Sequence, residues 1–248
     1  IMPEITHVLC LKEGEVFLKG KRDEVLTPEN IDRLYGLKTA PTGSIPAGQL
    51  NLEDLRKQSP AALLDMKRAT VRYGDVLVLD RLNWTMGWDE NWAVLGPDGA
   101  GKSTLVSLVI GDNPQAYANE IYIFGRRRGS GESIWDIKKH IGFVSSELQV
   151  HYRARLRAYD VVLSGFHDSI GLYRRAGKAQ QEAARQWMEI LGIWDKAEER
   201  FDQLSYGQRR MILLARSMVK GPVLLVLDEP CQGLDLSNRR MILDLIDY

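Results

Sequence analysis

The sequence predicts an α/β fold built around a phosphate-binding loop, on three observations. Residues 96–103, GPDGAGKS, match the pattern GxxxxGK[ST] and lie between a predicted strand at 92–95 and a predicted helix at 103–110. Residues 223–227 are a continuous run of Val and Leu, which is typical of a parallel strand buried on both faces. Strand and helix patterns alternate between these two segments, as in α/β proteins.

The chain begins with a segment that reads as a small separate unit, residues 1–36. Two β-rich runs flank Glu13-Gly14, which predicts a hairpin. Thr27 is then a candidate N-cap before Pro28 at the first helical position, and Gly36 ends that helix. Residues 37–60 are rich in Pro and Gly and predict an extended linker.

Residues 61–248 carry the predicted α/β core, with a helical subdomain at about 147–204 inserted between the phosphate loop and the last strand. The chain starts with Ile1 and stops at Tyr248 inside an apolar-periodic run, so we expect it to be incomplete, with the core truncated at its C-terminal end. Strands are expected at residues 64–72, 76–79, 83–85, 92–95, 121–124, 141–144 and 223–227, and further helices at 178–191 and 205–220.

Composition excludes several classes of protein. The 248 residues are 44% hydrophobic and 27% charged, which is ordinary for soluble globular domains, and no apolar run approaches membrane-spanning length. A cytoplasmic protein is therefore expected. The net charge of +0 gives no overall attraction to nucleic acid, and the Arg126-Arg127-Arg128 cluster reads as a solvated loop face. Cys10 and Cys231 predict two reduced thiols and no zinc site.

The phosphate loop has the composition that nucleotide binding requires. Its glycines let successive backbone N–H groups turn toward an anion, and the helix that follows adds its positive end. Lys102 would reach the β and γ phosphates, and the Ser103 hydroxyl would bind Mg²⁺. A glycine-rich turn without a ligand is the alternative, which the flanking strand and helix disfavour. The predicted ATP site consists of Gly96, Pro97, Asp98, Gly99, Ala100, Gly101, Lys102, Ser103 and Thr104.

Two acids end the apolar strand at 223–227, where open α/β sheets bind their ligands. Asp228 is suited to hold Mg²⁺, and Glu229 to orient and deprotonate the attacking water. The alternative is a polar turn at the end of a strand. With the phosphate loop in the same chain, we interpret Glu229 and Lys102 as catalytic residues and Asp228 and Ser103 as metal ligands.

The segment LSYGQ, residues 204–208, opens the predicted helix at 205–220. Taken alone, Ser205 and Gln208 form an SxxQ capping box, which is a purely structural explanation. In order and spacing, however, GPDGAGKST, LSYGQ and LLVLDEP followed by Gly233-Leu234-Asp235 resemble the ATP-binding cassette family, whose signature is LSGGQ.

That resemblance implies a partner, because cassettes of this family sandwich two ATP molecules head to tail. The signature residues Ser205, Tyr206, Gly207 and Gln208 would then face ATP held by a second cassette. Asp235 would lie in the loop that links the two sites. Tyr73, 23 residues before Gly96, matches the aromatic that stacks on adenine; a core aromatic is the alternative.

Residues 111–146 resemble more closely one subgroup, the ModF-like tandem-cassette ATPases associated with molybdate import. Residues 1–36 then resemble the C-terminal tail of a preceding cassette, with residues 61–248 forming most of a second one.

Three departures from the family pattern affect this prediction. Ser146 stands where the family carries a Gln, with Glu147 and Gln149 as substitutes, and Tyr206 replaces a signature glycine. None of the histidines matches the family's switch histidine. The chain as given is therefore expected to bind ATP weakly or moderately and to hydrolyse it poorly. The four histidines are His7, His140, His151 and His167.

For the intact protein, the sequence predicts ATP binding and hydrolysis. It does not decide which process the hydrolysis drives. One alternative is an importer subunit for molybdate or a related oxyanion, which needs a separate membrane permease and would lie at the inner face of the plasma membrane. The other is a soluble regulator of tandem-cassette type. Ser146, which stands where the family carries a Gln, favours this second alternative. A nucleic-acid-associated ATPase and a hydrolytically impaired interaction protein are weaker alternatives.

Overall fold

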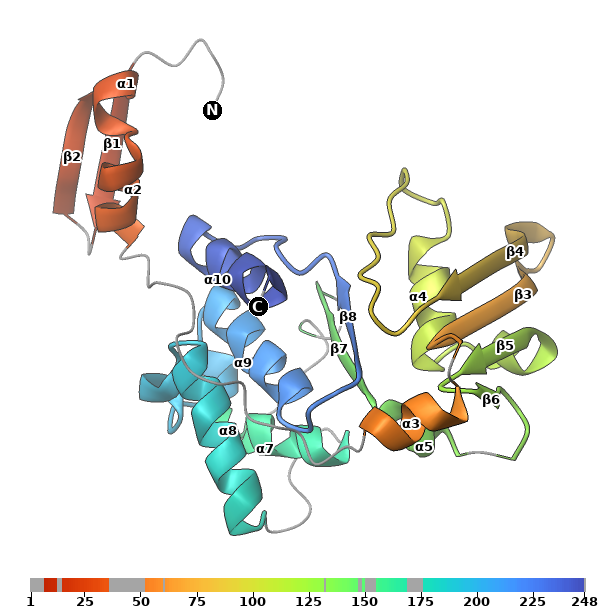
Figure 1. Cartoon of the computed structure of the whole chain (residues 1–248). Helices are drawn as coiled ribbons and strands as arrows, with labels where there is room; N and C mark the ends of the chain where they lie inside the picture. Colours follow the sequence, from red (N-terminus) through yellow and green to blue (C-terminus); the bar gives the residue numbers. More distant parts are fainter. Residues whose placement is uncertain are drawn as a thin grey trace. The chain divides into compact units, whose positions relative to one another are not determined.

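A computed structural model of the chain describes residues 7–12, 15–35, 52–59, 61–131, 133–146, 149, 155–168 and 176–247. It divides into two compact units, Ile1–Ser44 with Cys231–Tyr248, and Ile45–Pro230. Helices and strands alternate along the second unit (Figure 1), so the predicted α/β class is confirmed.

The first unit contains the predicted hairpin and helix. Strands β1 (His7–Lys12) and β2 (Glu15–Lys21) pair antiparallel, followed by α1 (Arg22–Val25) and α2 (Pro28–Tyr35). The Thr27 hydroxyl accepts the N–H of Asn30 at 3.2 Å, as expected of an N-cap. Residues 13, 14 and 36 lie outside the described part of the chain.

Helix α10 (Leu236–Asp247) belongs to this same unit, which differs from the predicted boundaries near residues 36 and 60. After Pro230 the chain passes through a turn in which Gly233 has a φ of 69°, a conformation that favours glycine. The sequence predicts one domain over residues 61–248, whereas Cys231–Tyr248 group with the N-terminal unit.

The predicted linker at 37–60 is wrong for its last part, because α3 (Leu52–Gln58) is a helix. Acidic residues begin it and basic residues end it, which suits the helix dipole. Leu55 on this helix is buried in the hydrophobic core, and the carbonyl of Ser59 accepts a hydrogen bond from the Trp88 indole at 2.6 Å. The Pro- and Gly-rich composition of residues 37–60 does not indicate this contact. Residues 36–51 lie outside the described part.

The second unit contains two sheets. Four strands form an antiparallel sheet in the order β4-β3-β5-β6, and two parallel strands form the other. In the parallel pair, Ser145 lies opposite Asp228. The antiparallel strands are β3 (Leu64–Tyr73), β4 (Val76–Met86), β5 (Glu120–Ile123) and β6 (Arg126–Arg127); the parallel ones are β7 (Ile141–Ser145), preceded by helix α5 (Ile134–Lys138), and β8 (Leu224–Asp228).

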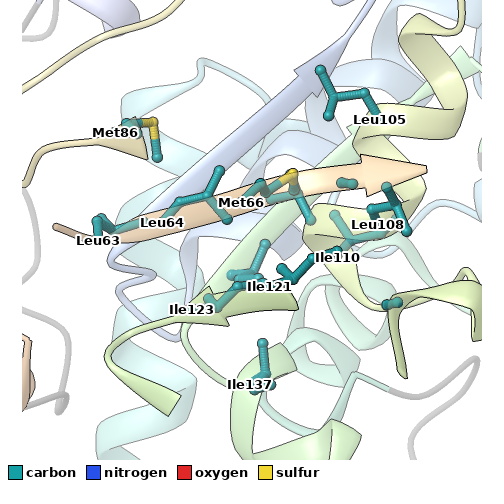
Figure 2. Packing of buried hydrophobic residues seen from close by; sticks show 14 of the residues in the cluster. Leu63, Leu64, Met66, Met86, Leu105, Leu108, Ile110, Ile121, Ile123 and Ile137 are labelled. Carbon is teal, nitrogen blue, oxygen red and sulfur yellow. The ribbon is translucent and has the colours of Figure 1, made fainter. Parts of the chain in front are cut away.

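The hydrophobic core of the second unit lies between the antiparallel sheet and helix α4 (Lys102–Ile110) (Figure 2). Leu64 and Met66 of β3 point into it, together with Ile121 and Ile123 of β5. Leu105, Leu108 and Ile110 cover them from α4. This packing fixes the helix that follows the phosphate loop.

Helices follow β7, as predicted for the inserted subdomain. Helix α9 contacts α7 and α8 and also β7 (Figure 1). Trp187 is buried, whereas Trp194 is partly exposed and packs edge-on against Tyr159 at 5.7 Å between ring centroids. The helices are α7 (Ala158–Leu163), η2 (Ser164–His167), α8 (Lys178–Ile190), η3 (Trp194–Lys196), η4 (Phe201–Gln203) and α9 (Tyr206–Met218).

The predicted strand at 92–95 is wrong: these residues have no regular secondary structure. A strand needs a neighbour for its backbone N–H and C=O groups, and apolar sequence alone does not supply one. Trp92 and Leu95 are 53% and 88% exposed, so this apolar segment is not packed into the core. The helix after the loop forms as predicted.

The arginine cluster is solvated only in part. Arg126 and Arg127 are exposed, but Arg128 is 2% exposed and its guanidinium lies 5.3 Å from the centre of the Tyr117 ring. Absence of a side chain at Gly111 makes room for the Arg128 side chain, because a Cβ there would lie 2.8 Å from an Arg128 nitrogen.

In the described residues, helices that combine the length and hydropathy of a membrane span do not occur.

Candidate functional site

The phosphate loop leads directly into α4. Gly101 is the residue before the helix and has a φ of 90°, and a Cβ at this position would lie 2.9 Å from Leu79 and 3.1 Å from the carbonyl oxygen of Val78. Only glycine therefore fits both the backbone conformation and the approach to β4. No side chain caps the first turn of α4, so its N-terminal N–H groups are available to an anion.

Lys102 folds back over its own loop. Its ammonium donates to the carbonyl oxygens of Gly96 and Pro97, each at 2.8 Å, and lies 3.9 Å from the Asp98 carboxylate. The Ser103 side chain is exposed beside it, and Thr104 is partly exposed. The cationic group and a hydroxyl are thus both placed at the positive end of the helix.

Asp228 is the last residue of β8, and Glu229 follows it directly. Glu229 has a φ of 49°, which is unusual for a residue with a side chain, and its carboxylate-bearing side chain is exposed. The backbone around it is held by Arg210 of α9. The Arg210 guanidinium donates to the carbonyl oxygens of Glu229 at 2.6 Å and Pro230 at 3.2 Å.

The start of α9 is a capping box. The backbone N–H of Gln208 donates to the Ser205 hydroxyl at 3.2 Å, and the N–H of Ser205 donates to the Gln208 side-chain oxygen at 2.9 Å. The structural explanation of this serine is therefore confirmed. It leaves the Ser205 side chain exposed, so it does not exclude a second role in binding.

The residues that follow β7 contact the same helix at two points. The Ser146 hydroxyl accepts from Arg210 at 3.0 Å, and the amide of Gln149, which is 2% exposed, donates to the carbonyl oxygen of Tyr206 at 2.9 Å. Ser146 and Gln149 are two of the three residues considered for the missing glutamine. Both side chains therefore bind helix α9 of their own chain.

Tyr73 is the last residue of β3, and its side chain is 52% exposed. The prediction that it is available for stacking is consistent with this exposure, and the core alternative is wrong. Its hydroxyl accepts a hydrogen bond from the side-chain amide of Asn113 at 3.0 Å.

The structure unites some of the predicted residues and separates others. Helix α4 contacts β8, so the phosphate loop and the strand of Asp228 belong to one unit, although among the described residues no hydrogen bond or ion pair joins Lys102 to Asp228 or Glu229. Asp235 belongs to the other unit, where its carboxylate accepts from the backbone N–H of Asn238 at 2.8 Å.

Sequence reasoning missed Arg210, which connects three of the predicted segments. It has 0% exposure on a helix whose neighbouring buried residues are Met211, Leu213 and Leu214. A charged residue on the apolar face of a predicted helix is a detectable signal, because burial of an isolated charge requires partners. The amide side chains around Tyr73 carried no such signal.

Comparisons with known proteins identify a matching family and relatives. A family model described as "ABC transporter" matches residues 79–232. The chain is 52% identical over 184 residues to the ABC transporter ATP-binding protein ModF of Escherichia coli (strain K12), an alignment that covers 73% of this chain and 37% of that protein. It is 32% identical to the uncharacterized ABC transporter ATP-binding protein YlmA of Bacillus subtilis (strain 168), with 75% and 70% covered.

Among solved structures, the chain is similar to a dimeric ATP-binding cassette in a post-hydrolysis state bound to ADP and Pi. The TM-score is 0.62 at 24% identity, with 74% of this chain and 81% of that chain covered. At this identity the likeness concerns the fold alone. The chain spans little more than a third of the length of ModF, so activities of whole relatives do not transfer to it directly.

Proposed function

Since the chain belongs to the ABC transporter family, whose model matches residues 79–232, we propose that it binds Mg²⁺·ATP at residues 96–104 and, paired with a second cassette, hydrolyses it to ADP and phosphate. The observation that carries this proposal is the loop itself: an uncapped helix N-terminus, a lysine ammonium and an exposed serine hydroxyl at one point.

The chemistry of these groups fits the proposed ligands. An ATP triphosphate would attract the Lys102 ammonium away from the two carbonyl oxygens that it now contacts, because a phosphate oxygen carries charge and a carbonyl oxygen does not. Mg²⁺ prefers oxygen ligands, which Ser103 and Asp228 supply. When bound, the ion would neutralise charge on the phosphates.

Glu229 is the residue that we assign as general base. Its exposed carboxylate follows the strand whose end carries Asp228, and the Arg210 contacts to its backbone would restrict where that carboxylate can go. Phosphoryl transfer asks the protein chiefly for such positioning and for charge stabilisation. Tyr73 would stack on the adenine ring through its exposed face.

The second cassette would meet the start of α9, where Ser205, Tyr206, Gly207 and Gln208 would approach its γ phosphate. The exposed Ser205 hydroxyl supports this role. Asp235 would belong to the connection between the two sites. The second cassette would be part of the same full-length polypeptide or of another copy.

Binding is tested by calorimetric titration of the chain with Mg²⁺·ATP. Lys102→Ala should weaken binding at least tenfold, since it removes a charged hydrogen-bond donor from the phosphates. Lys178→Ala, at the exposed start of α8, is the matched control and should leave the affinity unchanged. Equal affinities of the wild type and Lys102→Ala would contradict the assignment of this loop.

Hydrolysis is tested on the protein together with its second cassette, by phosphate release. Glu229→Gln keeps the size of the side chain and removes the base, so hydrolysis should fall by 10²-fold or more while ATP binding persists. A variant that hydrolyses ATP at the wild-type rate would exclude Glu229 as the base, without affecting the binding proposal.

ATP hydrolysis at this site could serve one of two biological roles. One is an energy-coupling subunit for import of molybdate or a related oxyanion through a permease, at the inner face of the plasma membrane; the other is a soluble ATP-switched regulator in the cytoplasm. The contacts of Ser146 and Gln149 with α9 favour the second, because they engage the residues that would otherwise be available to a permease. ATP-dependent oxyanion uptake that requires this protein would decide for the first.

A further inference from the structure

Tyr73 is held by a segment that the proposed function does not use, Asn113 with η1 (Pro114–Ala118) and Asn119. Two side-chain amides of this segment each pair with the backbone of β3 through two hydrogen bonds. Gln115 accepts from the N–H of Arg72 at 3.1 Å and donates to its carbonyl oxygen at 2.8 Å. Asn119 does the same for Thr70, at 2.7 and 2.9 Å.

These amides continue the sheet where its neighbouring strand is absent. Strand β5 pairs with β3 only from Leu64 to Lys67. Thr70 and Arg72 are alternate residues, so their N–H and C=O groups point to the same side of the strand. Gln115 and Asn119 satisfy those groups in place of a strand, which fixes the backbone that ends at Tyr73.

Asn113 binds Tyr73 at the opposite end of the side chain, at its hydroxyl. Asn113 is 4% exposed and donates from one amide nitrogen to Tyr73 at 3.0 Å and to the Ser107 hydroxyl of α4 at 3.4 Å. Its backbone N–H also donates to the Ser107 carbonyl oxygen at 3.1 Å. One buried side chain therefore connects the tyrosine ring to the helix that begins at the phosphate loop.

We propose that Asn113 is a positioning residue for the base of the bound nucleotide: it fixes the Tyr73 ring relative to α4, so that a purine can stack on the ring while its phosphates lie at residues 96–103. This inference rests on the proposed ATP binding. It assigns to the segment 113–119 a role in base affinity, distinct from the phosphate contacts that the loop itself makes.

A double-mutant cycle on the whole chain tests it, with titrations of Mg²⁺·ATP and of Mg²⁺·triphosphate, which lacks the base. Asn113→Ala and Tyr73→Phe both remove the hydrogen bond between the Asn113 amide and the Tyr73 hydroxyl. Asn113→Ala also removes the contacts of that side chain with the Ser107 hydroxyl and with the N–H of Gln115. Each should weaken ATP binding about three- to tenfold, the fold-change that corresponds to one hydrogen bond between neutral groups. The double variant should be no weaker than either single one. Triphosphate affinity should not change.

Asn83→Ala is the matched control. The Asn83 side chain also binds the backbone of β3, at the N–H of Arg68 at 2.9 Å, but it does not contact Tyr73. It should leave both affinities unchanged. Were a merely structural role correct, Asn113→Ala would weaken ATP and triphosphate binding equally, or would add its effect to that of Tyr73→Phe, and either result overturns the inference.

The remaining outcomes are also decisive. If Asn113→Ala does not fold, Tyr73→Phe alone decides, because it removes the same bond while the ring stays; an ATP affinity equal to that of the wild type overturns the inference. If wild-type protein binds ATP no more tightly than triphosphate, base stacking and this inference both fail while the phosphate site stands. If the wild type binds neither, the proposed function itself fails.

Discussion

Arg210 is the residue whose replacement tests most directly how the backbone that carries Glu229 is supported. It has 0% exposure, and its guanidinium donates to the carbonyl oxygens of Glu229 and Pro230 and to the Ser146 hydroxyl. Arg210→Met keeps a long side chain and removes all of these donors. The two carbonyl oxygens would then lose a donor that water does not easily replace.

The expected cost follows from those contacts. A buried acceptor left without its donor costs about 1–3 kcal/mol; because the bonds to Glu229 and Pro230 are only partly buried, the two together should fall in the lower half of roughly 2–6 kcal/mol. Removal of a buried guanidinium recovers part of its desolvation penalty. We therefore expect Arg210→Met to lower the free energy of unfolding of the second unit by about 3 kcal/mol.

Urea unfolding followed by tryptophan fluorescence measures this change, because all six tryptophans of the chain lie within Ile45–Pro230. Arg209→Met is the matched control: Arg209 precedes Arg210 on the same helix, and its Nε has no hydrogen-bond partner among the described residues. It should change stability by less than about 1 kcal/mol. Equal urea midpoints for the two variants would refute the proposed support of Glu229.

Three further changes have defined outcomes. Gly165→Ala places a Cβ 2.0 Å from the carbonyl oxygen of Arg216, so it should destabilise by about 3 kcal/mol or more, whereas Gly177→Ala, with its nearest atom at 4.0 Å, should be close to neutral in the same urea assay. Burial, followed by the charges of neighbouring cations, lowers the pKa of His140 to about 4 from 6.5. The unfolded chain thus binds the proton first, and about 3 kcal/mol of stability should be lost as pH falls from 6.5 to 4; His140→Asn should remove this part of the pH dependence, and an unchanged profile would contradict it. Ser205→Ala should cost about 1 kcal/mol through loss of the helix cap, with Ser205→Thr near the wild type by thermal unfolding; a neutral alanine variant would argue against capping.

The local chemistry of the sequence determined several parts of this protein. Glycine-rich turns, caps and apolar periodicity are short-range features, and they gave the phosphate loop with α4, the capping box of α9 and the strand that ends at Asp228. The α/β class followed from the alternation of such elements. Short-range rules sufficed there because the residues that define each element are neighbours in the chain.

Pairing and burial between distant segments were decided only by the tertiary structure. Residues 92–95 have the composition of a strand and form none, while Leu52–Gln58 has the setting of a linker and forms a helix that buries Leu55. Among the described residues, the first segment has no neighbouring strand to pair with, and the second packs against residues far along the chain; no local pattern contains either condition.

The same holds for the supports of the candidate site. Arg210 reaches residues 19, 20 and 64 positions away, and Asn113 reaches Tyr73 across 40. The sequence by itself predicts which groups would touch ATP, because phosphate chemistry constrains their type and spacing. Which side chains hold those groups in place was settled by the fold, because a hydrogen bond depends on proximity in space and leaves no spacing in the sequence.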